Sequence, residues 1–141
     1  MRSKPRLVFD TNVLLDAICF PSSFGRQAYV LALRTVDIMM SEATLHEVTA
    51  VLQRPKFDRF VPAHIRYAAL AALRSDMTFM EPWCHYRVCR DATDDKFIDL
   101  AVCAGAEAII SRDADLLALT PCNGIRIEDA RQFVLSKSQR T

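Results

Sequence analysis

Short apolar runs alternate with segments of helical character along this 141-residue chain, and the alternation constrains its fold more than any other feature. Residues 6–10, 36–40 and 108–110 are short enough to be buried strands rather than helices. A weak strand is predicted at 78–80 and a last, edge strand at 125–127. Strands that alternate with helices indicate a parallel sheet covered on both faces. We therefore expect an α/β fold, a three-layer α/β/α sandwich with a central parallel sheet.

Helical segments are predicted between these strands from apolar periodicity and from residues that start or stop helices. The expected ranges are 13–18, 24–33, 41–53, 62–75, 93–104, 113–117 and 130–135. Ser23 and Ser41 are N-cap candidates because their hydroxyls can accept a backbone N–H, and Gly105 suits a helix end. The tail 136–141 is expected to be loose.

Two of these helices have a predicted orientation. In the helix that begins at Pro62, the side chains expected to face inward are Ile65, Ala69, Ala72 and Leu73. In the next long helix Asp94 heads the buried stripe, whereas Lys96 and Asp99 should be exposed. Asp91 and Asp95, like Asp99, are expected to serve solubility or capping.

Four acids are distinguished by their positions. Asp10 ends the first strand, Asp113 follows the strand at 108–110, and Asp94 falls near a helix start. Glu47 lies on the rim of the core-facing stripe of its helix. In an open parallel sheet, the carboxyl ends of strands share one edge with the amino ends of the following helices, and ligands bind there. We expect the four carboxylates to gather at that edge, where their repulsion favours a cation between them.

This set of acids suits metal-assisted hydrolysis of a phosphodiester. Hard divalent cations take carboxylate oxygens, and such an ion both acidifies a bound water and neutralises charge on a phosphate. Taken singly, each acid could have an ordinary role: Asp94 and Asp113 could cap helices, and Glu47 could be a solvated surface residue. The hypothesis therefore depends on the four acids together. Asp115 could be a second acid behind the site or another cap.

Size and composition exclude few functions. The length suits one domain, with a core expected over about 6–127. The net charge of +1 gives no strong indication of nucleic acid, and no apolar run is long enough to predict a membrane span. Five cysteines at irregular spacing predict a reducing compartment and free, mostly buried thiols. Cys84, His85 and Cys89 could form half of a zinc site, but no second pair lies at the required spacing.

Several segments resemble one known family. They are Val8-Phe9-Asp10-Thr11-Asn12-Val13-Leu14-Leu15, the helix that carries Glu47, Asp94-Asp95-Lys96-Phe97-Ile98-Asp99-Leu100-Ala101, and Ile109-Ile110-Ser111-Arg112-Asp113. In this order they resemble the PIN domain, and most closely its bacterial subfamily of VapC-like toxins from toxin–antitoxin systems. The resemblance extends from about Arg6 to Ile127. The D-T-N and S-R-D motifs are fairly specific together and weak alone.

The resemblance implies a ribonuclease that depends on Mg²⁺ or Mn²⁺ and acts on RNA in the cytoplasm, away from any membrane. It also implies a cognate antitoxin protein as partner and a homodimer. The acids that match the catalytic and metal-holding pattern are Asp10, Glu47, Asp94 and Asp113, with Asn12, Ser111 and Asp115 as supporting residues. Ser111 stands where Thr is commoner in the family. The segment 55–89 is longer and more divergent than in the smallest toxins, so the resemblance does not extend to substrate recognition.

Three other functions fit parts of this pattern. A phosphatase with a strand-end aspartate nucleophile usually has a second acid two residues later, where this chain has Asn12. A degenerate PIN-like module would bind RNA or a partner without cleaving, and the four intact acids argue against it. A receiver-like signalling domain also clusters acids at this edge, but Asp10 is followed by Thr11 and Asn12, and no phosphoacceptor strand end is evident elsewhere.

Overall fold

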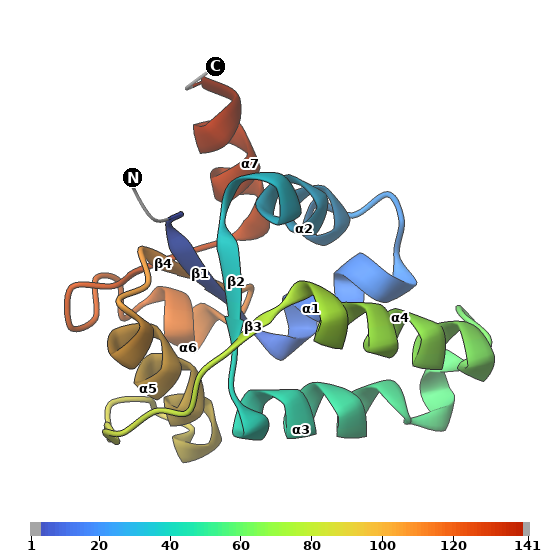
Figure 1. The fold of residues 1–141 in the computed structure, drawn as a ribbon, viewed down its shortest axis with the longest axis horizontal. Helices are drawn as coiled ribbons and strands as arrows, with labels where there is room; N and C mark the ends of the chain where they lie inside the picture. Colours follow the sequence, from blue (N-terminus) through green and yellow to red (C-terminus); the bar gives the residue numbers. More distant parts are fainter. Residues whose placement is uncertain (1–3, 140–141) are drawn as a thin grey trace.

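A five-stranded parallel sheet forms the centre of the computed structural model, which describes residues 4–139 (Figure 1). The strand order is β3-β2-β1-β4-β5, so the first strand of the chain is the middle strand of the sheet. The strands are β1 (Arg6–Phe9), β2 (Asp37–Met40), β3 (Thr78–Phe79), β4 (Ala108–Ile110) and β5 (Arg126–Glu128). All four pairings are parallel, as the alternation of strands and helices predicts.

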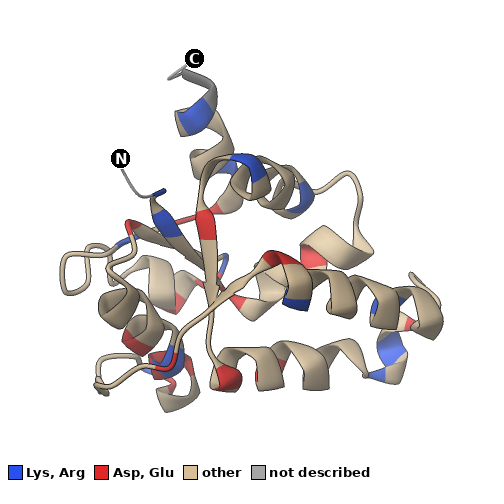
Figure 2. Cartoon of the chain, in the orientation of Figure 1, with Lys and Arg blue, Asp and Glu red and all other residues tan. Residues whose placement is uncertain are grey.

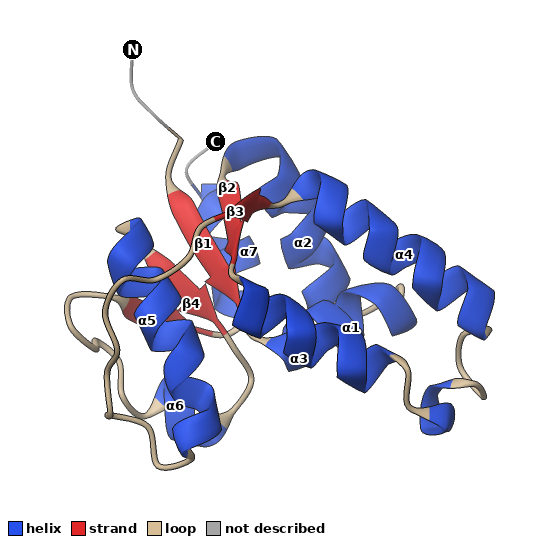
Figure 3. Ribbon diagram, turned by 60° about the horizontal axis from the view of Figure 1, so that its bottom comes forward, coloured by secondary structure: helices blue, strands red, loops and turns tan. Residues whose placement is uncertain are grey.

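Helices cover both faces of this sheet, which confirms the three-layer α/β/α sandwich (Figure 3). One face carries α1 (Thr11–Cys19), α2 (Phe24–Thr35), α3 (Glu42–Leu52), α4 (Ala63–Asp76) and α7 (Ala130–Gln139). The other face carries α5 (Asp95–Ala104) and α6 (Ala114–Leu117). Two short 3-10 turns, η1 (Pro55–Phe57) and η2 (Ala92–Asp94), precede α4 and α5.

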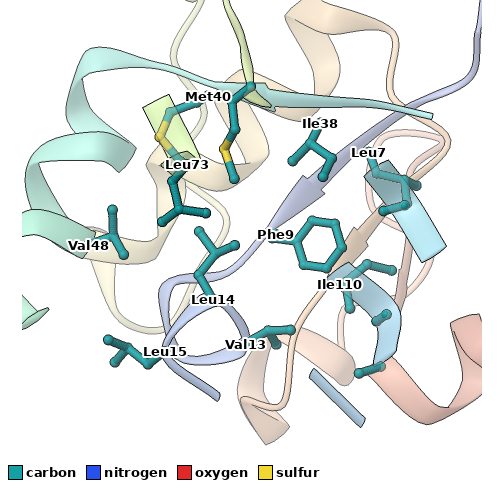
Figure 4. Close-up of a cluster of buried hydrophobic side chains, with 14 of the residues drawn as sticks. Leu7, Phe9, Val13, Leu14, Leu15, Ile38, Met40, Val48, Leu73 and Ile110 are labelled. Atoms are coloured by element: carbon teal, nitrogen blue, oxygen red, sulfur yellow. The ribbon is translucent and has the colours of Figure 1, made fainter. Parts of the chain in front are cut away.

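The two-residue period of the strands divides the core between these layers. Leu7 and Phe9 of β1 point into the cluster beneath α1 to α4, whereas Val8 points into the cluster beneath α5. Figure 4 shows part of the first cluster, in which Phe9 and Ile110 from neighbouring strands lie above side chains of α1. Because β1 is buried on both faces from Leu7 onward, its sequence is continuously apolar from Leu7 to Phe9.

Local signals set the helix ends where the sequence predicts them. The Ser23 hydroxyl accepts a hydrogen bond from the backbone N–H of Arg26 at 3.1 Å. Ser41 and Thr44 form a reciprocal capping box at the start of α3, with distances of 3.2 and 2.9 Å. Gly105 ends α5 in the left-handed conformation at φ 64°, where a side chain would be strained.

The inward face predicted for α4 is wrong in part. Ile65 is 47% exposed and Ala72 is also exposed, while Leu73 is buried as expected. The other buried residue of this helix is Arg66, whose guanidinium donates to the Leu52 carbonyl at 2.8 Å and pairs with Asp58 at 2.8 Å. Arg66 takes an inward position because each of these buried N–H groups has a partner.

Three further expectations can be compared with the structure. The helix predicted to end at residue 135 continues as α7 to Gln139, so residues 136–139 are not loose; 140 and 141 lie outside the described residues. All five cysteines are free, but only Cys19 and Cys122 are buried, and the other three are half-buried. Within residues 4–139 no helix is both long and apolar enough to cross a membrane.

Candidate functional site

The pairing of β1 with β4 brings the first and last predicted acids to one edge of the sheet. The backbone N–H of Asp10 donates to the carbonyl of Ile110 at 2.8 Å, so the two strands end side by side. The Ser111 hydroxyl, completely buried, donates to Oδ2 of Asp10 at 2.7 Å. The same hydroxyl accepts the backbone N–H of Asp113 at 3.0 Å. Ser111 therefore connects Asp10 to the loop that carries Asp113.

Asp10 is a buried carboxylate, only 5% exposed. Burial raises its pKa above the ordinary 3.8; the Ser111 hydrogen bond opposes that shift, and the nearby Glu47 and Asp113 add to it. In the part of the chain that the structure describes, no Lys or Arg is paired with Asp10. A buried, unpaired carboxylate at a strand end costs stability, which indicates a role beyond structure.

Asp94 lies at the junction of η2 and α5, where its side chain makes no capping hydrogen bond. Burial, and after it repulsion from Asp10, Asp113 and the other acids, together raise its pKa from 3.8 to about 6. Asp113 does cap the next helix, because it accepts the N–H of Asp115 at 2.9 Å. The simple capping alternative thus fits Asp113 and does not fit Asp94.

Glu47 reaches the same place from α3 and uses both of its oxygens. It accepts a short hydrogen bond from the Thr11 hydroxyl and pairs with the Lys96 ammonium at 2.8 Å. The Lys96 side chain is only 22% exposed, so the prediction of an exposed lysine is wrong. No pattern in the sequence predicts this contact, because it depends on how α3 packs against α5.

All four predicted acids line one cavity of about 420 Å³ at the carboxyl ends of the central strands. Asn12 also lines it, as does Asp91, whose carboxylate accepts the N–H of Thr93 at 3.0 Å and caps η2 as expected. Arg112 borders the cavity and is fixed by Asp16, with Nε 2.9 Å from Oδ2. Asp115 is not among the lining residues; its carboxylate lies 4.0 Å from the guanidinium of Arg90.

The donor set suits a hard divalent cation, although the side chains are not drawn together. Among residues 4–139, no three Asp, Glu, His or Cys side chains are placed to hold one ion, and this applies to Cys84, His85 and Cys89 as well. The acids nevertheless offer only oxygen ligands in one cavity, and burial, with repulsion among the acids added to it, raises the pKa of Asp10 and Asp94. An ion held there would relieve that repulsion by drawing the carboxylates inward.

The exposed role predicted for Asp99 is wrong, and so is the solubility role of Asp95. Asp99 is buried; its Oδ1 accepts the N–H of Tyr86 at 2.6 Å, and its Oδ2 lies 3.2 Å from Nδ1 of His85. One oxygen of Asp95 accepts the N–H groups of Val88 and Cys89 at 3.2 and 2.8 Å. Both acids therefore anchor the irregular segment between β3 and η2 onto α5.

Comparison with known proteins identifies the family of the chain. The model of the PIN domain family matches residues 6–115, which include all four acids. The uncharacterized protein MJ1680 of Methanocaldococcus jannaschii is 30% identical over 118 residues, covering 82% of this chain and 76% of the relative.

Solved structures share the fold at low sequence identity. VapBC2 of Rickettsia felis, bound to a DNA fragment from its promoter, superimposes with a TM-score of 0.62 at 11% identity, covering 88% of this chain and 98% of that one. VapC20 of Mycobacterium tuberculosis, a toxin that cleaves the sarcin–ricin loop, gives 0.56 at 14% identity, with coverages of 85% and 98%.

Proposed function

This chain belongs to the PIN-domain family, and we propose on that premise that it is a metal-dependent endoribonuclease that hydrolyses RNA phosphodiesters. The family match supports a nuclease fold. One observation carries the proposal further: Asp10, Glu47, Asp94 and Asp113 line a single cavity at the carboxyl ends of a parallel sheet. Two of these carboxyls have raised pKa values, as expected of groups gathered for a cation.

Asp10, Asp94 and Asp113 are the residues that would hold Mg²⁺ or Mn²⁺, since none of them has a cationic partner among the described residues. The ion supplies acidification of a water and neutralisation of phosphate charge. Ser111 orients Asp10 by its hydrogen bond, and Arg112 offers a guanidinium for a phosphate at the same cavity.

In this proposal Glu47 lies beside the three aspartates that would hold the metal and is not itself one of those three ligands. The Thr11 hydroxyl and the Lys96 ammonium hold its carboxylate at the cavity wall. From there it adds negative charge to the site and, on exchanging Lys96 for the ion, could become a fourth ligand.

We propose further that the protein is the toxin of a type II toxin–antitoxin pair and acts in the cytoplasm as a homodimer with a cognate antitoxin. The support is the shared fold with VapBC2 and VapC20 across most of the chain. A reading frame for a small DNA-binding protein beside the gene would test this role. Co-purification of its product with this chain is the expected result, and a failure of the two to associate would contradict it.

A binding module that does not cleave is the second candidate. The observation that favours it is the engagement of both Glu47 oxygens, which leaves one of the four acids tied to protein groups. Cleavage distinguishes the two candidates. The nuclease cleaves RNA and stops when the metal is removed, whereas the binding module does not cleave with or without metal.

The test is cleavage of a structured RNA in Mn²⁺, with EDTA as the metal-free control and circular dichroism to confirm folding. Asp94→Asn keeps the side-chain size but removes a charge, so we expect cleavage to fall by about 100-fold, or ~3 kcal/mol of transition-state stabilisation. The matched control is Glu107→Gln, which removes an exposed carboxylate at the opposite end of β4. Equal cleavage by the folded Asp94 variant, or by the parent in EDTA, would refute the mechanism.

A further inference from the structure

The cavity that holds the acids has a second end with a different chemistry. Its acidic end is lined by residues at the ends of β1 and β4 and the start of α5, and its far end is lined by residues of α1, α3 and η1 and by residues that directly follow α1 and α3. The residues that line this far end are Phe20, Val51, Arg54, Lys56 and Phe57. Figure 2 shows basic segments just beyond the end of α3, away from the acidic strand ends. One continuous cavity therefore joins a cluster of carboxylates to a group of basic and aromatic side chains.

Local structure places Arg54 and Lys56 at this far end. Pro55 follows directly on Arg54 and opens η1, which turns the chain away from α3. Phe57 is buried beneath the turn, and the Lys56 ammonium lies 5.2 Å from the centre of its ring. Within residues 4–139 neither Arg54 nor Lys56 is paired with a carboxylate. Both charges are free to meet an anion.

An exposed aromatic pair lies beside these cations. Phe20, just after α1, meets Phe60, just after η1, edge to face at a centroid distance of 5.2 Å and an interplanar angle of 65°. The two rings are 37% and 54% exposed, although apolar rings gain stability from burial. The Arg59 guanidinium lies 5.8 Å from the centre of the Phe60 ring and adds a third positive charge. Exposed phenyl rings next to unpaired cations are the groups that bind unstacked bases and their phosphates.

We propose that this basic–aromatic end holds a single-stranded segment of RNA next to the phosphodiester that is cleaved. Arg54 and Lys56 bind phosphates of that segment, and Phe20, supported by Phe60, stacks against one unpaired base. A duplex keeps its bases stacked on one another and so offers no free base face to a phenyl ring. The inference rests on the proposed function, because it assigns the strand that leads to the acids.

The test is fluorescence anisotropy with a short, labelled, single-stranded oligoribonucleotide in EDTA, where binding is measured without cleavage. We expect Phe20→Ala to weaken binding roughly 10-fold, because stacking contributes most of the sequence-independent affinity apart from charge. Phe20→Leu keeps apolar volume without the ring, so it should weaken binding too while preserving the melting temperature. The matched control is Phe79→Ala on β3, a 46% exposed ring that does not line the cavity.

The contribution of Arg54 and Lys56 is measured separately, by the salt dependence of RNA affinity. The double variant Arg54→Gln, Lys56→Gln should lower the slope of log affinity against log salt by about 1.4, or ~0.7 for each lost phosphate contact on a single strand. The double control Lys4→Gln, Arg34→Gln removes two exposed charges elsewhere and should leave the slope unchanged. A perfectly paired duplex of the same sequence should bind more weakly and should not respond to Phe20→Ala.

The outcomes separate this inference from the proposed nuclease activity. If the parent cleaves in Mn²⁺ while the Phe20 and the double charge variants bind as the parent does, the strand path is wrong and the nuclease stands. If the parent binds through Phe20 but never cleaves, the nuclease is wrong. Loss of binding by the Phe79 control equal to that by the Phe20 variants would overturn the assignment to this end of the cavity.

Discussion

Asp94 has a pKa that makes the stability of the metal-free protein depend on pH. The carboxyl titrates near 6 in the folded chain because of burial and then of its acidic neighbours, against 3.8 as its ordinary value. Between these values the folded state binds more protons than the unfolded state, so stability falls as pH rises from about 4 to 6. Above pH 6 the carboxylate is ionised in both states and the dependence from this group ends.

The corresponding measurement is thermal unfolding in EDTA at pH 5 and pH 7. We expect the parent to melt at a lower temperature at pH 7, and Asp94→Asn to lose part of that difference. Asp10, whose pKa is also raised, should account for the remaining dependence in the same direction. A parent more stable at pH 7 than at pH 5, with an unchanged difference in the Asp94 variant, would contradict this account.

Metal binding should show the opposite pH dependence from the metal-free stability. Protons and Mn²⁺ compete for the same carboxylates, so affinity measured by titration calorimetry should rise between pH 5 and pH 7 and then level off. In the Asp94→Asn variant the rise should be smaller, because one competing proton has been removed.

Much of the site is predictable residue by residue because strand ends and helix starts have sequence signals. Asp10, Asp94 and Asp113 follow or precede apolar runs, and the sheet brings them to one cavity. Asp99 is different, since its burial comes from an irregular segment that folds back over α5 and has no periodicity to read. The partial burial of Lys96 is likewise not predictable from the sequence, because its partner Glu47 lies on another helix.

At the scale of elements, the segment between β3 and η2 depends on Asp99. This carboxylate accepts from the backbone N–H of Tyr86, so Asp99→Asn loses a charged acceptor in a buried position. We expect the free energy of unfolding to fall by about 1–3 kcal/mol. Trypsin should also cleave faster after Arg87 in the loosened segment.

Asp115→Asn is the control for that variant. Its carboxylate is 56% exposed, and we expect its stability to remain within about 0.5 kcal/mol of the parent. If urea titration gave the Asp99 variant the stability of the parent, the anchoring role would be wrong.

The contact of Lys96 with Glu47 joins α5 to α3 at the cavity wall. Lys96→Met removes a positive charge next to the acids, so Mn²⁺ should bind more tightly while the metal-free protein loses at most about 1 kcal/mol of stability. Lys4→Met, at an exposed position far along the chain, is the matched control. Calorimetry should show a change in affinity only for Lys96→Met, and weaker binding by that variant would mean that the lysine mainly positions Glu47.

At the scale of the whole molecule, α7 closes the helical layer over α2 although it is the last element of the chain (Figure 1). Phe133 is 1% exposed in the main core cluster, so Phe133→Ala should lower the free energy of unfolding by about 3–5 kcal/mol. Leu135→Ala on the same helix removes a side chain that is 47% exposed and should cost far less. Chemical denaturation of both variants checks this, and equal losses would mean that α7 stabilises the fold by some route other than its buried face.

The layer arrangement is predictable from the alternation of strands and helices, but the faces of the outer helices are less so. On α4, Ile65 is exposed and Arg66 is buried, because hydrogen bonds to neighbouring backbone groups favour the arginine inside. The periodicity of apolar residues cannot predict that a charged side chain is buried. The end of α7 at Gln139 also differs from the predicted end at residue 135. Its last turn is polar and contains no residue that marks where a helix stops.

The central place of β1 has a consequence for the order in which a ribosome makes this chain. Asp10 emerges early, yet β4, one of the two strands that pair with β1, and the hydroxyl that orients the Asp10 carboxylate come about a hundred residues later, at Ile110 and Ser111. A nascent polypeptide that stops before Ala108 therefore carries three of the four acids without the backbone that assembles them. Under the proposed function, cleavage of RNA needs all four acids, so we expect it to begin only after translation has passed Asp113 and expect incomplete products released earlier to leave the surrounding transcripts intact.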